Sequence, residues 1–238
     1  MRVQLCILAV AAVVAVVNSA NLPSFIKACS TSDPNLNQCI EKTITAAGKS
    51  FAKGIPELGI ASLDPVELGT VVVDNPALKV TFTDTIVTGL GDFRINAYKI
   101  NTEKGKATLD FTANVTLKAH YDMDGQVLIL PIRGNGQSKI KITNLNIIIK
   151  YEYKTVDDHW VVTSHKDSYK MDRAVFKFNN LFGGNKDLAD TTIKFLNENW
   201  SVIMQEIAPP ALDQIIHKCV EEVKKFFAAV PASELLIA

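Results

Sequence analysis

Few stretches of this 238-residue sequence combine residue types and spacing that could do chemistry. Gly48-Lys49-Ser50 is similar to the end of a phosphate-binding loop, but that motif needs a glycine where the chain has Thr43. Asp122-Met123-Asp124-Gly125 is similar to the start of a calcium loop, but Arg133 stands where the closing glutamate belongs. A helical lysine and a hairpin turn explain these two stretches better.

The histidines and serines show no catalytic or zinc-binding arrangement. His120, His159, His165 and His217 fit neither the HExxH pattern nor a zinc-ligand spacing with cysteine. The sequence contains no GxSxG nucleophile motif. We therefore expect a protein that is not an enzyme and that holds no metal and no cofactor. A lipid esterase with dispersed catalytic residues stays open as an alternative.

Residues 1–20 have the parts of a secretory signal peptide. Arg2 precedes an unbroken apolar run from Leu5 to Val17, which Asn18-Ser19-Ala20 ends. The run is shorter than the roughly 18–20 residues that span a bilayer, which argues against a retained anchor. We expect cleavage near Ala20, secretion into an extracellular fluid, and a single mature domain over residues 21–238 without stable membrane insertion.

The overall charge is balanced, with 25 Lys and Arg against 25 Asp and Glu. A balanced chain has no long-range field that gathers phosphates, so we expect no nucleic-acid partner. The apolar content of 47% is too high for a disordered chain. These values fit a freely diffusing, monomeric globular protein.

Three cysteines remain once Cys6 leaves with the signal peptide. Cys29 and Cys39 can form a local disulfide, which would stabilise the fold by about 2–3 kcal/mol on the chain-entropy model. Cys219 lies on the apolar stripe of a predicted helix. A buried free thiol is the favoured interpretation of Cys219, and a reactive or intermolecular thiol is the alternative.

The period of the apolar residues predicts a helix followed by strands. Asp33-Pro34 and an i, i+4 apolar stripe predict a helix over residues 34–53, which Gly54 ends. Every second residue from Ala107 to Met123 is apolar, and each residue between them is polar. This alternation predicts one very long strand with a dry and a wet face, and a strand of that length must twist and curl.

Further strands and two helical segments follow this long strand. The apolar phase slips by one residue between Ile142 and Leu145, which predicts a β-bulge. We expect a turn at Asp157-Asp158 and five to seven antiparallel strands in all. After Gly183-Gly184 the period returns to 3.6, and Pro209-Pro210 is expected to interrupt the long C-terminal helix with a kink or a restart. The fold class is therefore α+β, with a curled sheet that a helix covers.

Several segments, in this order, resemble the insect takeout and haemolymph juvenile hormone-binding protein family. They span essentially all of residues 22–236: Leu22 to Cys29 and Asp33 to Cys39, then Gly54 to Ile60 with Leu63-Asp64-Pro65, Gly89 to Ile95, Leu130 to Gly136, and Asn180 to Gly184 with Phe195 to Trp200. The resemblance implies a long C-terminal helix wrapped by a strongly curved antiparallel sheet around an elongated hydrophobic tunnel. It also implies a secreted carrier of extended lipophilic ligands, with links to circadian and feeding physiology.

The inward-facing large residues are the candidate lining of this tunnel. They are Phe82, Phe93, Phe111, Val115, Leu117, Tyr121, Leu128, Leu130, Phe176, Trp200, Met204 and Ile207. Burial of a long alkyl or isoprenoid chain against such residues contributes about 0.8 kcal/mol per methylene. Pattern alone does not separate a tunnel from a filled core. An extracellular signalling protein with a merely structural pocket, acting through an unknown receptor, is therefore the second hypothesis.

Two features bear on the ligand and on modification. Juvenile hormone carriers of the haemolymph have a second disulfide, which Cys219 alone cannot supply. The chain thus resembles the takeout branch more closely, and its ligand stays open among a juvenile hormone-like terpenoid, a fatty acid and another long-chain lipid. Asn114-Val115-Thr116 and Asn199-Trp200-Ser201 are glycosylation sequons, so Asn114 and Asn199 are candidate acceptor sites.

Overall fold

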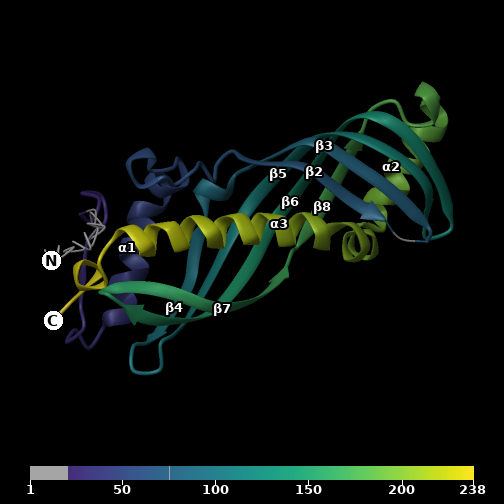
Figure 1. The fold of residues 1–238 in the computed structure, drawn as a ribbon. Helices are drawn as coiled ribbons and strands as arrows, with labels where there is room; N and C mark the ends of the chain where they lie inside the picture. The colour runs from purple at the N-terminus through teal and green to yellow at the C-terminus, as the bar shows by residue number, and fades with distance from the viewer. Residues whose placement is uncertain (1–20, 75) are drawn as a thin grey trace, which may run out of the picture.

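The computed structural model describes residues 21–74 and 76–238. The predicted signal peptide, residues 1–20, therefore lies outside the described residues. One long helix, α3 (Trp200–Ala229), lies along a large curved antiparallel sheet (Figure 1). The helix α1 (Leu36–Ala52) packs near the carboxyl end of α3, and α2 (Lys186–Glu198) lies at the other end. This arrangement confirms the expected fold class.

The large sheet has seven strands in the order β2-β3-β5-β6-β7, with β4 paired to β5 and β8 paired to β6. Their bounds are β2 (Val66–Asp74), β3 (Leu78–Thr88), β4 (Arg94–Asn101), β5 (Lys106–Val127), β6 (Leu130–Val156), β7 (His159–Lys170) and β8 (Arg173–Phe178). All of these pairings are antiparallel, as predicted.

The two longest strands form the centre of the sheet. β5 has 22 residues and β6 has 27, and they pair from Val127↔Leu130 to Lys106↔Glu152. Each is too long for one neighbour, so β3 and β4 share the free edge of β5, while β8 and β7 share that of β6. The predicted alternation holds along β5, where alternate side chains face the interior.

The predicted bulge is present in β6. Ala113 pairs with Leu145 and Val115 pairs with Ile142, so two residues of β6, Thr143 and Asn144, stand opposite one residue of β5. Asn144 has a φ of 50°, and its N–H donates to Asn114 Oδ1 at 2.8 Å. A bulge increases the local twist and bends the strand. The phase slip in the sequence therefore marks a point where the sheet curves.

The turn predicted at Asp122–Gly125 is wrong. These residues continue β5, with Asp124 opposite Arg133, and the chain turns at Leu128 and Ile129 instead. A Cβ on Gly125, whose φ is 144°, would lie 2.4 Å from the carbonyl oxygen of Ala77. A glycine is therefore needed at position 125 because the backbone at Ala77 approaches it closely. Gly125 itself does not form a turn.

The restart predicted as one outcome at Pro209-Pro210 is wrong, because α3 continues through both prolines. The other outcome, a kink, stays a prediction. The helical segments separate at Asn199, which ends α2 and whose Nδ2 donates to the Phe195 carbonyl. The prolines leave the carbonyls of Gln205 and Glu206 without their usual helical donors. Both of these residues are exposed, so water can solvate the freed carbonyls.

Two of the remaining short elements, β1 and β9, join the two ends of the chain. The short elements are β1 (Cys29–Ser30), β9 (Leu236–Ile237), the helix α4 (Ala232–Leu235) and three 3₁₀ turns (Pro56–Leu58, Leu90–Asp92 and Phe182–Gly184). β1 pairs in parallel with β9, and the Leu22 N–H donates to Glu234 Oε2 at 2.6 Å. The expected disulfide between Cys29 and Cys39 is present. It ties residues 21–30, which we call the leader, to α1.

A carboxylate in the loop before β2 positions one wall of the interior. Asp64 Oδ1 accepts the Gly89 N–H at 3.0 Å, and Oδ2 accepts the Gly91 N–H at 2.8 Å. These bonds hold the turn that carries Leu90 and leads to Phe93. The turn has little freedom, since a Cβ on Gly89 would lie 2.1 Å from the Asn114 carbonyl oxygen.

We predict that Asp64→Ala lowers the free energy of unfolding by about 2–4 kcal/mol, because it leaves two backbone donors without their charged acceptor. Chemical denaturation measures this change. The matched control is Asp92→Ala, since Asp92 forms only an exposed ion pair with Lys49 and should cost less than about 0.5 kcal/mol. Equal losses in the two variants would contradict the assigned role of Asp64.

Candidate functional site

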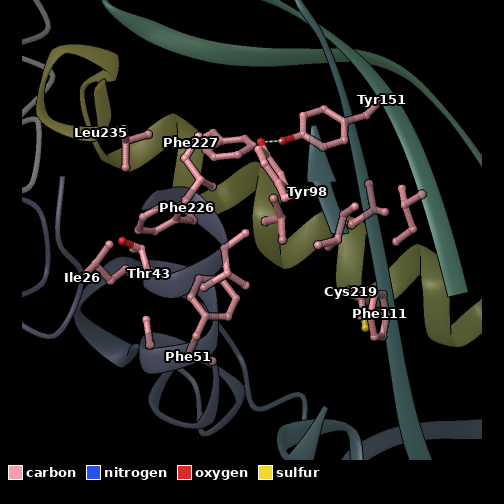
Figure 2. A pocket seen from close by; sticks show the side chains of 18 of the residues that line it. Ile26, Thr43, Phe51, Tyr98, Phe111, Tyr151, Cys219, Phe226, Phe227 and Leu235 are labelled. Atoms are coloured by element: carbon pink, nitrogen blue, oxygen red, sulfur yellow. Dashed lines mark hydrogen bonds between the residues drawn. The ribbon is translucent and has the colours of Figure 1, made fainter. Parts of the chain in front are cut away.

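A cavity lies between α1, the carboxyl half of α3 and the inner face of the sheet. Its volume is about 310 Å³, at the lower end of the ~300–1,000 Å³ usual for small-molecule sites. Figure 2 shows side chains from all three of these parts of the fold pointing into the same space. We call this space the main cavity.

Most of the main cavity wall is aliphatic or aromatic, with a few polar atoms. The lining residues are Ile26, Lys27, Cys29, Ile40, Thr43, Ile44, Ala47, Gly48, Phe51, Ala52, Leu63, Leu90, Phe93, Tyr98, Leu109, Phe111, Ile149, Tyr151, Trp160, Val162, His165, Cys219, Val220, Val223, Phe226, Phe227, Leu235 and Leu236. Such a wall favours an apolar ligand, since it removes hydrocarbon from water and offers few partners to a charged group.

A pair of tyrosines supplies the clearest polar feature of the wall. The hydroxyls of Tyr98 and Tyr151 lie 2.7 Å apart and point toward each other (Figure 2). Burial raises the pKa of Tyr98 to about 12 and the pKa of Tyr151 well above 10, so both phenols stay protonated at neutral pH. Because one hydroxyl donates to the other oxygen, the tyrosine that accepts keeps its own O–H free to donate elsewhere.

Two sulfur-bearing positions also line the cavity. Cys29 belongs to the disulfide, and Thr43 Oγ1 donates to the Lys27 carbonyl at 3.2 Å beside it. Cys219 is a free, partly buried thiol on α3. Burial raises the pKa of the Cys219 thiol to about 12, and the Glu222 carboxylate acts in the same direction. The thiol is therefore a neutral part of an apolar wall.

The lysine stretch Gly48-Lys49-Ser50 has a packing role at the cavity. A Cβ on Gly48 would lie 2.3 Å from Cζ of Phe93, so the glycine lets that ring pack directly on α1. The Phe93 ring also meets Phe111 edge to face, with centroids 5.9 Å apart. Lys49 points to solvent and pairs with Asp92. The preferred interpretation of a helical lysine thus agrees with its position in α1.

A second, much smaller cavity lies further along the sheet, under the amino half of α3. Its volume is about 30 Å³, and it shares no lining residue with the main cavity. Thr85 contributes the polar atom of its wall: the side chain is 1% exposed, and Oγ1 has no hydrogen-bond partner among the described residues. This cavity is too small to hold a whole small-molecule ligand.

The predicted lining residues lie in several different parts of the structure. Phe93 and Phe111 line the main cavity, while Phe82, Val115, Leu117, Met204 and Ile207 line the small one. Tyr121, Phe176, Leu130 and Trp200 line neither of these two cavities; Trp200 lies under the Arg173 guanidinium, 6.0 Å from the ring centroid. Leu128 is 38% exposed at the β5–β6 turn. That these residues touch a ligand stays a prediction.

The sequence interpretation missed most of the main cavity wall. The stripe of α1, which includes Ile40, Ile44 and Phe51, predicts a helix, and it also indicates an inward face that could line a cavity. Ile26 of the leader completes the wall together with Leu235 and Leu236, which belong to residues 230–238 after α3. We call this last segment the tail. The short segments that carry these residues have no usable period, so no sequence pattern indicates where they pack.

The candidate glycosylation residues differ in their surroundings. Asn114 is exposed on the outer side of β5, and its Oδ1 holds the β6 bulge. Asn199 is half-buried between α2 and α3, with Nδ2 bonded to Phe195. Glycosylation at either residue stays a prediction.

Within residues 21–74 and 76–238, no group of His, Cys, Asp or Glu is arranged to hold a metal ion. In the same ranges, no helix combines the length and apolarity needed to cross a bilayer.

The fold and the cavity define a class of protein, one that binds a hydrophobic small molecule between a curved sheet and a long helix. The chain belongs to the haemolymph juvenile hormone binding protein family, whose family model matches residues 5–237. This match confirms the resemblance seen in the sequence.

Individual relatives agree with the family assignment. Takeout 1 of Epiphyas postvittana has the same fold, with a TM-score of 0.84 and 30% identity over 90% of this chain and all of that chain. The circadian clock-controlled protein daywake of Drosophila melanogaster is 28% identical, over 91% of this chain and 88% of that protein. A putative beta-carotene-binding protein of Schistocerca gregaria is 20% identical over about half of each chain.

We predict that Cys219 reacts with a maleimide at pH 8 at least 100-fold more slowly in the folded protein than in the unfolded chain. A pKa of about 12 leaves little thiolate at that pH, and the wall restricts access. Stopped-flow labelling with and without denaturant measures the two rates, with Cys219→Ser as the blank. Comparable rates would show that the thiol does not lie in a dry wall.

Proposed function

We propose that this protein is a secreted carrier that binds an extended hydrophobic small molecule in the main cavity. The observation that carries the proposal is the main cavity itself, with its almost wholly apolar wall. The disulfide between Cys29 and Cys39 supports an extracellular site of action, because such bonds persist in oxidising compartments. The apolar start of the sequence, residues 1–20, supports secretion.

The binding free energy is expected to come from desolvation. Each buried methylene contributes about 0.8 kcal/mol, so ten methylenes supply about 8 kcal/mol before the cost of ordering the ligand. Much of the wall is aromatic, with Phe51, Phe226 and Phe227 among its rings. Flat rings of this kind suit an isoprenoid or alkyl chain equally well, which leaves terpenoids, fatty acids and other long-chain lipids as the ligand classes.

The tyrosine pair is proposed to select a polar group on the ligand. The spare O–H of Tyr98 or Tyr151 can donate to a carbonyl, ester or ether oxygen that reaches it. The wall also includes two basic side chains, Lys27 and His165, and His165 is directly opposite Tyr151 in the pairing of β6 with β7. The favoured cargo is therefore a lipophile with an acceptor oxygen.

A bulky residue in the wall should abolish binding while the fold persists. We predict that Ile44→Trp weakens the binding of the fluorescent probe N-phenylnaphthylamine at least tenfold, because the indole occupies cavity volume. The matched control is Leu188→Trp, since Leu188 is 51% exposed on α2 and lines neither cavity. Fluorescence titration measures both, and circular dichroism checks the fold.

This experiment also separates the two function hypotheses. Displacement of the probe by a fatty acid or a terpenoid supports the carrier. Wild-type protein that is folded and delipidated, yet binds neither probe nor lipid, would reject the carrier and favour a signalling protein with a structural pocket. Hydrolysis of a bound ester would instead favour the lipid esterase.

The tyrosine pair makes a separate prediction about selectivity. The double variant Tyr98→Phe/Tyr151→Phe should bind methyl farnesoate about fivefold to tenfold more weakly, the effect of one lost hydrogen bond. Its affinity for farnesene, which has no acceptor oxygen, should change less than twofold. Because both phenols stay protonated, the ratio of the wild-type and double-variant affinities for methyl farnesoate should be constant from pH 6 to 9.

The control for this pair is Tyr169→Phe, since Tyr169 packs on the core but lines neither cavity. Competition titration against the fluorescent probe gives the affinities of wild type, the double variant and the control for both ligands. Parallel losses for the ester and the hydrocarbon would mean that the tyrosines only shape the wall.

A further inference from the structure

Four lysines gather on the outer face of the sheet, on three adjacent strands. Lys118 of β5 pairs directly with Lys139 of β6, and Lys139 pairs directly with Lys177 of β8. Lys141 lies two residues further along β6, on the same face. We call these four residues the lysine cluster. Because strands lie about 4.8 Å apart, the row of three spans only about 10 Å.

One acidic side chain lies beside the lysine cluster. It is Asp84, exposed at the bulge of β3 between Thr83, which is opposite His120, and Ile86, which is opposite Lys118, and it forms no ion pair with the four lysines. The other nearest same-face neighbours along and across the strands are Thr116, His120, Gln137, Thr143, Val175, Asn179 and Ile86. In the row itself, the first carboxylate is Glu67 of β2, two strands beyond Lys118. The overall charge of the protein is balanced, but this face of the sheet carries a local excess of positive charge.

This arrangement is unfavourable for the isolated molecule. Like charges directly opposite each other destabilise a sheet, and here they occur across two successive strand pairs. The Lys141 ammonium lowers the pKa of Lys139, with smaller contributions from desolvation, Lys118 and Lys177. None of the four amines forms an ion pair with a residue of the described ranges, in contrast to Lys49, which pairs with Asp92.

We propose that the lysine cluster binds a linear sulfated polysaccharide. A sulfated chain carries charge at every pH of interest, and its oxygens accept charge-assisted hydrogen bonds from ammonium groups. The cluster is a row on a sheet face, and neither described cavity includes any of its lysines. This geometry suits an extended polyanion lying across the strands better than a small anion, which needs an enclosed site.

The same surroundings disfavour two other polyanions. Single-stranded nucleic acids stack their bases on aromatic side chains, and no Phe, Tyr or Trp is among the neighbours named above. Docking on an anionic bilayer combines basic residues with an inserted apolar face. Here the apolar neighbours are only Ile86, which is 39% exposed, and the half-buried Val175.

The inference rests on the extracellular location proposed above, but not on the identity of the ligand. A carrier held through the outer face keeps its main cavity free, because the lysine cluster and the cavity share no residue. Attachment to a sulfated matrix would concentrate the carrier at a cell surface without blocking its cargo.

The test uses heparin as the sulfated probe and isothermal titration of the full mature protein at low ionic strength. The variant K118Q/K139Q/K141Q/K177Q should bind heparin at least tenfold more weakly than wild type, since an exposed ion pair contributes about twofold to fivefold. Wild-type affinity should fall as NaCl is added, because salt screens exposed charges. The control K42Q/K53Q/K154Q/K186Q removes the same charge from dispersed exposed sites and should change affinity less than threefold.

Three results would overturn the proposal: equal losses in the two quadruple variants, no binding of wild type to heparin, or tighter binding to phosphatidylserine vesicles or single-stranded DNA than to heparin. N-phenylnaphthylamine is titrated into the same samples to report the cavity. A wild type that binds heparin but not this probe would reject the carrier function alone. One that binds the probe but not heparin would reject the lysine cluster alone.

Discussion

The continuous pairing of β5 with β6 is the constraint on which the rest of the structure depends. Two strands of this length cannot lie flat on a small domain, because strands twist and the twist accumulates. The bulge at Thr143 and Asn144 adds curvature near the middle. The resulting concave face is longer than one helix can fill, so α1 and the chain ends must cover the part that α3 leaves open. The main cavity lies where these covers meet.

The distribution of polar groups follows from this geometry. The concave face holds apolar side chains with one hydrogen-bonded phenol pair, Tyr98 and Tyr151, whereas the convex face carries the charges. Each strand of the sheet therefore serves two environments through alternate residues. Along β5, Leu117 faces the small cavity and its neighbour Lys118 belongs to the lysine cluster. Ligand binding and surface recognition can thus change independently in this fold.

Much of the fold could be predicted from the sequence because its signals are local. The alternation from Ala107 to Met123 and the phase slip before Leu145 each reflect which face of one strand is dry. The errors arose where the three-dimensional surroundings of a residue decide its conformation. Gly125 leaves room for the Ala77 carbonyl of another turn. The prolines of α3 are tolerated because the carbonyls that they free belong to exposed residues. For the same reason, the sequence indicates which residues face inward. It does not indicate whether such a residue contacts another side chain or lines a cavity.

The contact between the leader and the tail sets an order on the assembly of the binding site. Ile26 near one end and Leu236 near the other stand in the same wall, joined by the β1–β9 pair. During synthesis the tail leaves the ribosome after every other wall residue, so the wall is open while the sheet, α1 and α3 are already available to fold. The wall of the main cavity is therefore complete only once Leu235 and Leu236 have packed in place.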